Sequence, residues 1–172
     1  MKKTAIGLGF TLAVLTALVV LGHFSAGNKP GFLTPDLFVS DFNLYLEILL
    51  VLGLTFGAFL ARRGSIEAHR VNQTIWVLVN AALVLFLMLP AMSDVKVTSV
   101  TDFKDARTAV TWLHAIVGTL TLISGIWLVL QMNDILPRRF HITWWKNLMR
   151  LTLAGYWTVA IIGFVTYYFW YY

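Results

Sequence analysis

Five stretches of about 20 mostly apolar residues run through the chain, and no other feature limits its fold as strongly. A helix of roughly 20 residues is long enough to cross the hydrocarbon core of a bilayer. It also pairs its backbone polar groups internally, as the bilayer requires. We therefore predict an all-α, polytopic membrane protein, a bundle of about five transmembrane helices that forms one domain over residues 1–172. The predicted helices span residues 4–24, 42–61, 74–92, 108–130 and 151–170.

The composition agrees with this prediction and leaves no room for a large soluble domain. Of the 172 residues, 59% are hydrophobic and 12% are charged, whereas a soluble domain usually has about 25% charged residues. The chain contains no cysteine, which excludes thiolate metal sites and iron–sulfur ligation. The sequence also lacks a phosphate-binding glycine loop and a zinc-protease motif, so it does not predict an enzyme.

The segments between the predicted helices carry Lys and Arg mainly on one side. Nine of these residues fall on the side of the N-terminus and four on the other. Positively charged short loops stay in the cytoplasm, which predicts a cytoplasmic N-terminus and an outer C-terminus. The asymmetry accounts for most of the net charge of +5, so we predict the lipid bilayer, and not a nucleic acid, as the partner. The nine residues are Lys2, Lys3, Arg62, Arg63, Arg70, Arg138, Arg139, Lys146 and Arg150.

The first apolar stretch follows Met1-Lys2-Lys3, which is also how a secretory signal peptide begins. The stretch is longer than the usual apolar region of about 7–15 residues in such a peptide. Phe24-Ser25-Ala26 also lacks a small residue at the −3 position of a cleavage site. We therefore expect a membrane helix here, with a signal peptide as the alternative.

Two ionisable residues lie inside predicted helices, where such groups are costly and often functional. Glu47 and His114 each lie about five or six residues from the outer helix end, roughly 8–9 Å below the boundary. His23, Met88 and Met92 fall in the same layer. Imidazole and thioether groups suit Cu(I) or a haem iron, and a carboxylate can orient a ligating histidine. The candidate metal ligands are His114, Glu47, Met88 and Met92, and the candidate haem ligands are His23 and His114.

Each of these candidates also has a structural explanation. Met88 and Met92 would be apolar packing residues, and His23 would be a solvated residue at the membrane interface. Glu47 and His114 would form a hydrogen bond that holds two helices together. These alternatives stay open at the level of the sequence.

Three further residues are candidates of another kind. His69 and Arg70 lie in the basic segment between the second and third helices, where cations meet anionic lipid headgroups. His69 and His141 would share a ligand if the two cytoplasmic loops met. Asn80 lies in the middle of the third helix and is expected to make a hydrogen bond between helices.

Small residues mark the faces on which the last two predicted helices pack, because they let helix backbones approach closely in lipid. Residues spaced by four, three and four share one face of a helix. We predict that these faces are packing surfaces within the bundle, so that His114 points into the bundle and not at lipid. The faces are His114, Gly118, Thr121 and Gly125 on the fourth helix, and Thr152, Gly155, Gly163 and Thr166 on the fifth.

The turn Arg63-Gly64-x-Ile66-x-x-His69-Arg70, followed by His114 and a final Tyr-rich helix, resembles a family of small bacterial membrane proteins. The family includes the CtaM-type factors needed to make active haem-copper cytochrome oxidase. The resemblance covers about residues 42–172. In two places the chain departs from the family pattern. It has Asn72-Gln73 where the family has a methionine, and Met88 and Met92 where the family has a further histidine.

The resemblance implies a membrane accessory factor in the assembly or cofactor maturation of a haem-copper respiratory oxidase, in the bacterial cytoplasmic (inner) membrane. It implies copper or haem near the outer face, with His114 as the outer histidine and His69 as the turn histidine. Two other functions are compatible with the sequence. One is a structural accessory subunit of a respiratory or photosynthetic membrane complex. The other is a small b-type cytochrome with His23 and His114 as axial ligands.

Overall fold

Helices make up nearly all of the protein, and no strand occurs within its described residues. The computed structural model describes residues 2–25, 33, 38–92, 95 and 97–172. The α-helices are α1 (Lys2–Ser25), α2 (Phe38–Arg62), α3 (Ile66–Leu83), α4 (Leu89–Met92), α5 (Ala106–Met132) and α6 (Trp145–Tyr171). A π-helical segment, η1 (Val84–Met88), joins α3 to α4, and the short 3₁₀ helices are η2 (Val100–Lys104) and η3 (Arg138–Phe140).

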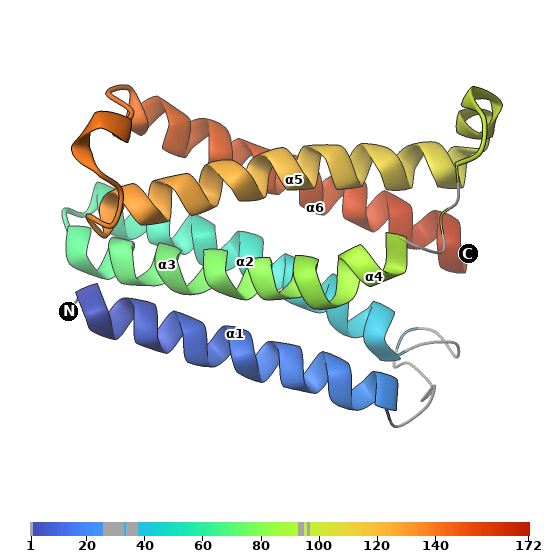
Figure 1. Cartoon of the computed structure of the whole chain (residues 1–172), viewed down its shortest axis with the longest axis horizontal. Coiled ribbons are helices and arrows are strands. Elements are labelled where there is room, and N and C mark those ends of the chain that lie inside the picture. Colours follow the sequence, from blue (N-terminus) through green and yellow to red (C-terminus); the bar gives the residue numbers. More distant parts are fainter. Residues whose placement is uncertain (1, 26–32, 34–37, 93–94, 96) are drawn as a thin grey trace.

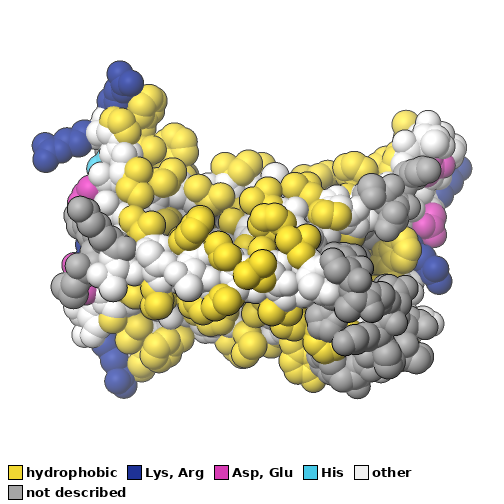
Figure 2. Space-filling model, turned by 60° about the horizontal axis from the view of Figure 1, so that its bottom comes forward, with side chains coloured by type: hydrophobic (Ala, Val, Ile, Leu, Met, Phe, Trp, Pro, Cys, Tyr) yellow, Lys and Arg dark blue, Asp and Glu magenta, His cyan; other side chains and the backbone are white. Residues whose placement is uncertain are grey.

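Five helical segments are long and apolar enough to cross a membrane, which confirms the predicted fold class. They are Thr4–Gly22, Phe38–Arg62, Ile66–Met92, Ala106–Met132 and Trp145–Tyr171. Large apolar side chains such as Leu52, Phe56 and Leu120 are exposed along them. Figure 2 shows a broad hydrophobic surface between two ends that carry the Lys and Arg side chains. This surface is consistent with a multi-pass protein in a lipid bilayer.

All five helices begin earlier than predicted, and those that begin at Phe38, Ile66 and Trp145 do so by four or more residues. The prediction stopped each helix where its apolar residues stop. Polar residues at a membrane boundary remain helical because the backbone hydrogen bonds do not depend on side-chain polarity. His69 and Arg70 therefore lie within α3 and not in a loop.

Four helices form a closed group, in which α2 contacts α3, α3 contacts α5, α5 contacts α6, and α6 contacts α2. Helix α1 packs against α3 outside this group (Figure 1). The small-residue faces of α5 and α6 are packing surfaces, as predicted, and they pack against each other. A Cβ atom added at Gly155 would lie 2.7 Å from Thr121 Oγ1, and one added at Gly125 would lie 2.7 Å from the Tyr156 hydroxyl. The core between the four helices consists of Leu50, Val51, Leu54, Val77, Val129 and Tyr156.

Helices α2 and α3 approach closely because Gly53 and Gly57 of α2 leave space for side chains of α3. A Cβ atom at Gly53 would lie 2.1 Å from Trp76 Nε1. The side chains of α3 in turn donate hydrogen bonds to backbone carbonyls of α2. Asn72 donates to Gly53 O at 2.8 Å, Gln73 donates to Leu54 O at 3.0 Å, and His69 Nδ1 donates to Gly57 O at 2.7 Å.

The two ends of the bundle differ in charge. We call the end that carries the α2–α3 turn and the α5–α6 connection the basic end, because Arg62, Arg63, Arg70, Arg138, Arg139, Lys146 and Arg150 lie there. The opposite end carries residues 97–105 and the end of α6 (Figure 1).

At the opposite end, two aspartates fix the residues that precede α5. Asp102 accepts hydrogen bonds from the backbone N–H groups of Thr98 at 2.7 Å and Ser99 at 2.9 Å. Asp105 caps α5 by accepting from Thr108 N at 3.0 Å. These hydrogen bonds lower the pKa of both carboxyl groups below the ordinary value. Their contribution to stability is present above the ordinary pKa and is lost as the pH falls through the lowered one.

Candidate functional site

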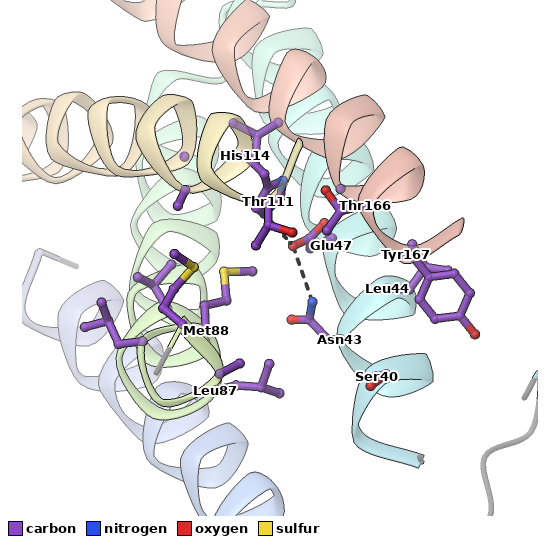
Figure 3. Close-up of a pocket in the computed structure, with 18 of the residues that line it drawn as sticks. Ser40, Asn43, Leu44, Glu47, Leu87, Met88, Thr111, His114, Thr166 and Tyr167 are labelled. Carbon is purple, nitrogen blue, oxygen red and sulfur yellow. Dashed lines mark hydrogen bonds and ion pairs between the residues drawn. The ribbon is translucent and has the colours of Figure 1, made fainter. Parts of the chain in front are cut away.

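A cavity of about 590 Å³ lies between α2, α3, η1, α4, α5 and α6 in the half of the bundle next to the opposite end. We call it the Glu47 cavity. Its volume falls within the range of about 300–1,000 Å³ that is usual for small-molecule sites. Its lining includes four of the predicted ligands, and Figure 3 shows Glu47, His114 and Met88 around the same space. The four are Glu47, Met88, Met92 and His114.

Glu47 and His114 face each other across the α2–α5 gap, which the sequence left undecided. His114 Nε2 lies 3.6 Å from Glu47 Oε1, and the two side chains are 14% and 9% exposed. This distance is too long for a hydrogen bond. The other ring nitrogen, Nδ1, is buried and has no partner with hydrogen-bond geometry among the described residues. The imidazole is thus held in the cavity without a close hydrogen bond at either nitrogen.

Gly163 of α6 makes room for this pair. A Cβ atom at Gly163 would lie 2.5 Å from Glu47 Oε2 and 3.0 Å from His114 Cε1. Any larger residue would therefore push the carboxylate or the imidazole away. On the other side, Asn43 Nδ2 donates to Glu47 Oε1 at 3.4 Å. Asn43 Oδ1 is buried and has no hydrogen-bond partner within the part of the chain that is described.

Glu47 and His114 lie farther from the ends of their helices than predicted. Glu47 follows the first residue of α2 by nine positions, and His114 follows the first residue of α5 by eight. At 1.5 Å per residue, they lie roughly 13 Å and 12 Å from the helix ends. The two residues still lie at nearly equal distances from the ends of their helices, as predicted.

Met88 reaches the cavity from the π-helical segment. The Leu89 N–H donates to Val84 O, five residues back, and Pro90 follows directly. Proline has no N–H and its ring clashes with the preceding turn, which explains a wider turn at this point. Such π-turns are frequent at functional sites. Met88 and Met92 are half-buried in the cavity lining.

Within the described residues, no group of three or more His, Cys, Asp or Glu side chains is placed to hold a metal ion. A metal in the Glu47 cavity would therefore need the thioethers as well as Glu47 and His114. A mixed set of one imidazole, two thioethers and one carboxylate is soft enough for Cu(I) and unsuited to Mg²⁺ or Ca²⁺.

A second group of polar residues, which the sequence did not single out, lies beside the cavity at the beginning of α2 and the end of α6. Asp41 is fully buried and accepts hydrogen bonds from the Tyr167 hydroxyl and from Leu33 N. Ser40 and Tyr171 also share a hydrogen bond. These contacts join the beginning of α2 to the end of α6. Asp41 lies before the predicted helix, so the apolar pattern placed it in a loop.

The structure does not test the proposed haem pair of His23 and His114. The His23 side chain lies outside the described residues. Helix α1 packs against α3, and the described side chains of α1 do not line the Glu47 cavity in which His114 lies. Helices α1 and α5 lie on different sides of α3 (Figure 1).

A second cavity, of about 750 Å³, lies between α2, α3, α5 and α6 at the basic end, and we call it the Arg70 cavity. His69, Arg70 and His141 all line it, so the two histidines of the basic end do approach one cavity. His141 Nε2 donates to Leu136 O at 2.9 Å, so one nitrogen of each of these rings is already hydrogen-bonded to a backbone carbonyl.

Asn80 makes the predicted contact between helices. Its Nδ2 lies 3.5 Å from the Tyr156 hydroxyl of α6, at the long limit of a hydrogen bond. Tyr156 lines both cavities and is 5% exposed. It therefore separates the Glu47 cavity from the Arg70 cavity in the middle of the bundle.

A scan against models of protein families found no match to the chain. Searches of the curated proteins and of the solved structures likewise found no match. The resemblance to the family with CtaM-type factors accordingly stays a prediction.

Proposed function

We propose that this protein is a membrane accessory factor that binds Cu(I) during the assembly of a haem-copper respiratory oxidase. The single observation that supports this function best is the meeting of His114, Glu47, Met88 and Met92 in one cavity. The family resemblance supplies the link to the oxidase.

Each of the four side chains would contribute to ion binding in its own way. His114 offers an imidazole nitrogen without a close hydrogen bond, and Met88 and Met92 offer thioethers, which Cu(I) prefers. Glu47 supplies a negative charge beside the cation and orients the ring. The thioether ligands would favour the reduced, singly charged state of copper.

The proposed orientation follows the Lys and Arg distribution, with the basic end in the bacterial cytoplasm. The Glu47 cavity would then open toward the outer side of the cytoplasmic membrane. A factor of this kind would receive copper on that side and pass it to an oxidase subunit.

Titration of the purified protein with Cu(I) against a chromophoric chelator tests this proposal. We expect one Cu(I) per chain, loss of binding in His114→Ala, and a roughly 10- to 100-fold weaker affinity in Glu47→Gln, Met88→Leu or Met92→Leu. Met132→Leu and Met149→Leu are matched controls, because both residues line the Arg70 cavity instead. They should bind Cu(I) like the unaltered protein.

Other outcomes would point to the alternatives. A Soret band that disappears in His114→Ala would replace copper by haem. A colourless, copper-free protein that copurifies with a stable membrane complex would support a structural subunit.

In cells that lack the chain, oxidase activity should fall, and His114→Ala should fail to restore it.

A further inference from the structure

The Arg70 cavity carries a strong excess of positive charge. Four cationic side chains line it, against one carboxylate, Asp134. They come from the end of α2, the beginning of α3 and the beginning of α6, so residues distant in the sequence converge on one opening. The four cations are Arg62, Arg70, Lys146 and Arg150.

Arg70 differs from the ordinary basic residues of this end. Its side chain is 13% exposed, although it pairs with Glu67 on the adjacent turn of α3. Its Nε is buried and donates no hydrogen bond to any described residue. An unpaired buried donor on a charged group is costly, and an anion in the cavity would remove that cost. By contrast, Arg63 and Arg139 are exposed and lie outside the lining.

Most of the remaining wall of the Arg70 cavity is apolar, although Gln73, Gln131 and Thr152 also line it. The apolar residues include Leu54, Val77, Leu128, Val129 and Leu153, and they extend from the cationic rim to Tyr156 in the middle of the bundle. A small inorganic anion would use only the rim. A molecule with an anionic head and a hydrocarbon tail would use both parts, and the flanking helices expose apolar side chains of the kind that contact acyl chains.

We propose that the Arg70 cavity binds one anionic phospholipid from the leaflet at the basic end. Its phosphate lies against Arg70, with Arg62, Lys146 and Arg150 around it, and one acyl chain lies between α2, α3, α5 and α6. Arginine suits this role because its planar group makes paired hydrogen bonds to phosphate oxygens. This binding site is independent of the copper proposal, because it lies on the other side of Tyr156.

Native mass spectrometry of the full chain, with phosphatidylglycerol added in detergent, tests this site. We expect one tightly held phosphatidylglycerol per chain and about tenfold weaker binding in Arg70→Gln and in Arg150→Gln. Arg150 is exposed at the rim, so its variant keeps the test valid if Arg70→Gln fails to fold. Matched controls are Arg63→Gln and Arg139→Gln, which remove the same charge from the same end and should retain the lipid.

Three results would overturn the proposal. Equal loss in the control variants would show general attraction between a basic surface and an anionic lipid. Equal retention of phosphatidylcholine would show that the negative charge is not recognised. Displacement of phosphatidylglycerol by inorganic phosphate at equal concentration would show a site for a free anion.

Discussion

Gly163→Ala is expected to weaken Cu(I) binding at least tenfold while leaving the helices in place. The added Cβ would lie 2.5 Å from Glu47 Oε2 and 3.0 Å from His114 Cε1, which is closer than atoms in van der Waals contact. The flexible carboxylate would move away from the imidazole. Displacing a residue that orients a metal ligand from the outer shell typically weakens metal affinity 10- to 100-fold. The measurement is the Cu(I) titration described above.

Gly118→Ala is the matched control for this prediction. Gly118 also lies in a membrane helix beside the cavity, but a Cβ there would meet only Val159 Cγ1, at 3.7 Å, an ordinary contact. This variant should bind Cu(I) normally. If both alanine variants bound Cu(I) as tightly as the unaltered chain, the position of Glu47 beside His114 would have no part in binding.

Gly53→Ala is expected to cause the largest loss of stability of any single methyl addition to α2. The new Cβ would lie 2.1 Å from Trp76 Nε1 and 2.2 Å from Trp76 Cε2. The indole packs against the core, so moving it away from α2 would disturb that packing. Overpacking costs about 1–3 kcal/mol, and strain on the hydrogen bond from Asn72 to Gly53 O adds about 1 kcal/mol.

The expected fall in melting temperature is roughly 5–15 °C for a chain of this size, measured by thermal unfolding in detergent. Gly7→Ala in α1 is the control, because nothing lies within 4 Å of a Cβ at Gly7. Equal melting temperatures for the two variants would contradict the close packing of α2 on α3.

The number of helices and the faces of α5 and α6 could be predicted because both follow from local patterns. Apolar length gives the spans, and the spacing of Gly118, Gly125, Gly155 and Gly163 gives the packing faces. The Gly53 and Gly57 pair was overlooked, although glycines four residues apart are a known signal of close helix packing.

The meeting of Glu47 and His114 could not be predicted from the sequence. Equal depth on two helices allows contact, but the rotation of each helix and the order of helices around the core decide it. Here the decisive contact is that of α6 with both α2 and α5, where Gly163 leaves room for both side chains. The π-turn at Val84–Met88 also changes which side chains of this helix face the cavity. A prediction from regular helical spacing cannot include this change.

Asp41 shows a different limit of sequence reasoning. Its charge and its neighbours suggested an exposed loop, yet it is fully buried at the beginning of α2. Its partner, Tyr167, is 126 residues away in the chain. A buried carboxylate of this kind becomes recognisable only when the fold brings a donor from the last helix.

Copper K-edge X-ray absorption of the Cu(I)-loaded protein tests the central claim most directly, because it reports the atoms bound to the metal. The arrangement of His114, Met88, Met92 and Glu47 predicts one Cu(I) per chain with both sulfur and nitrogen or oxygen neighbours. The sulfur signal should decrease in Met88→Leu and in Met92→Leu. A protein that retains no copper, or copper with only nitrogen and oxygen neighbours that is unchanged in these variants, would contradict the proposed site.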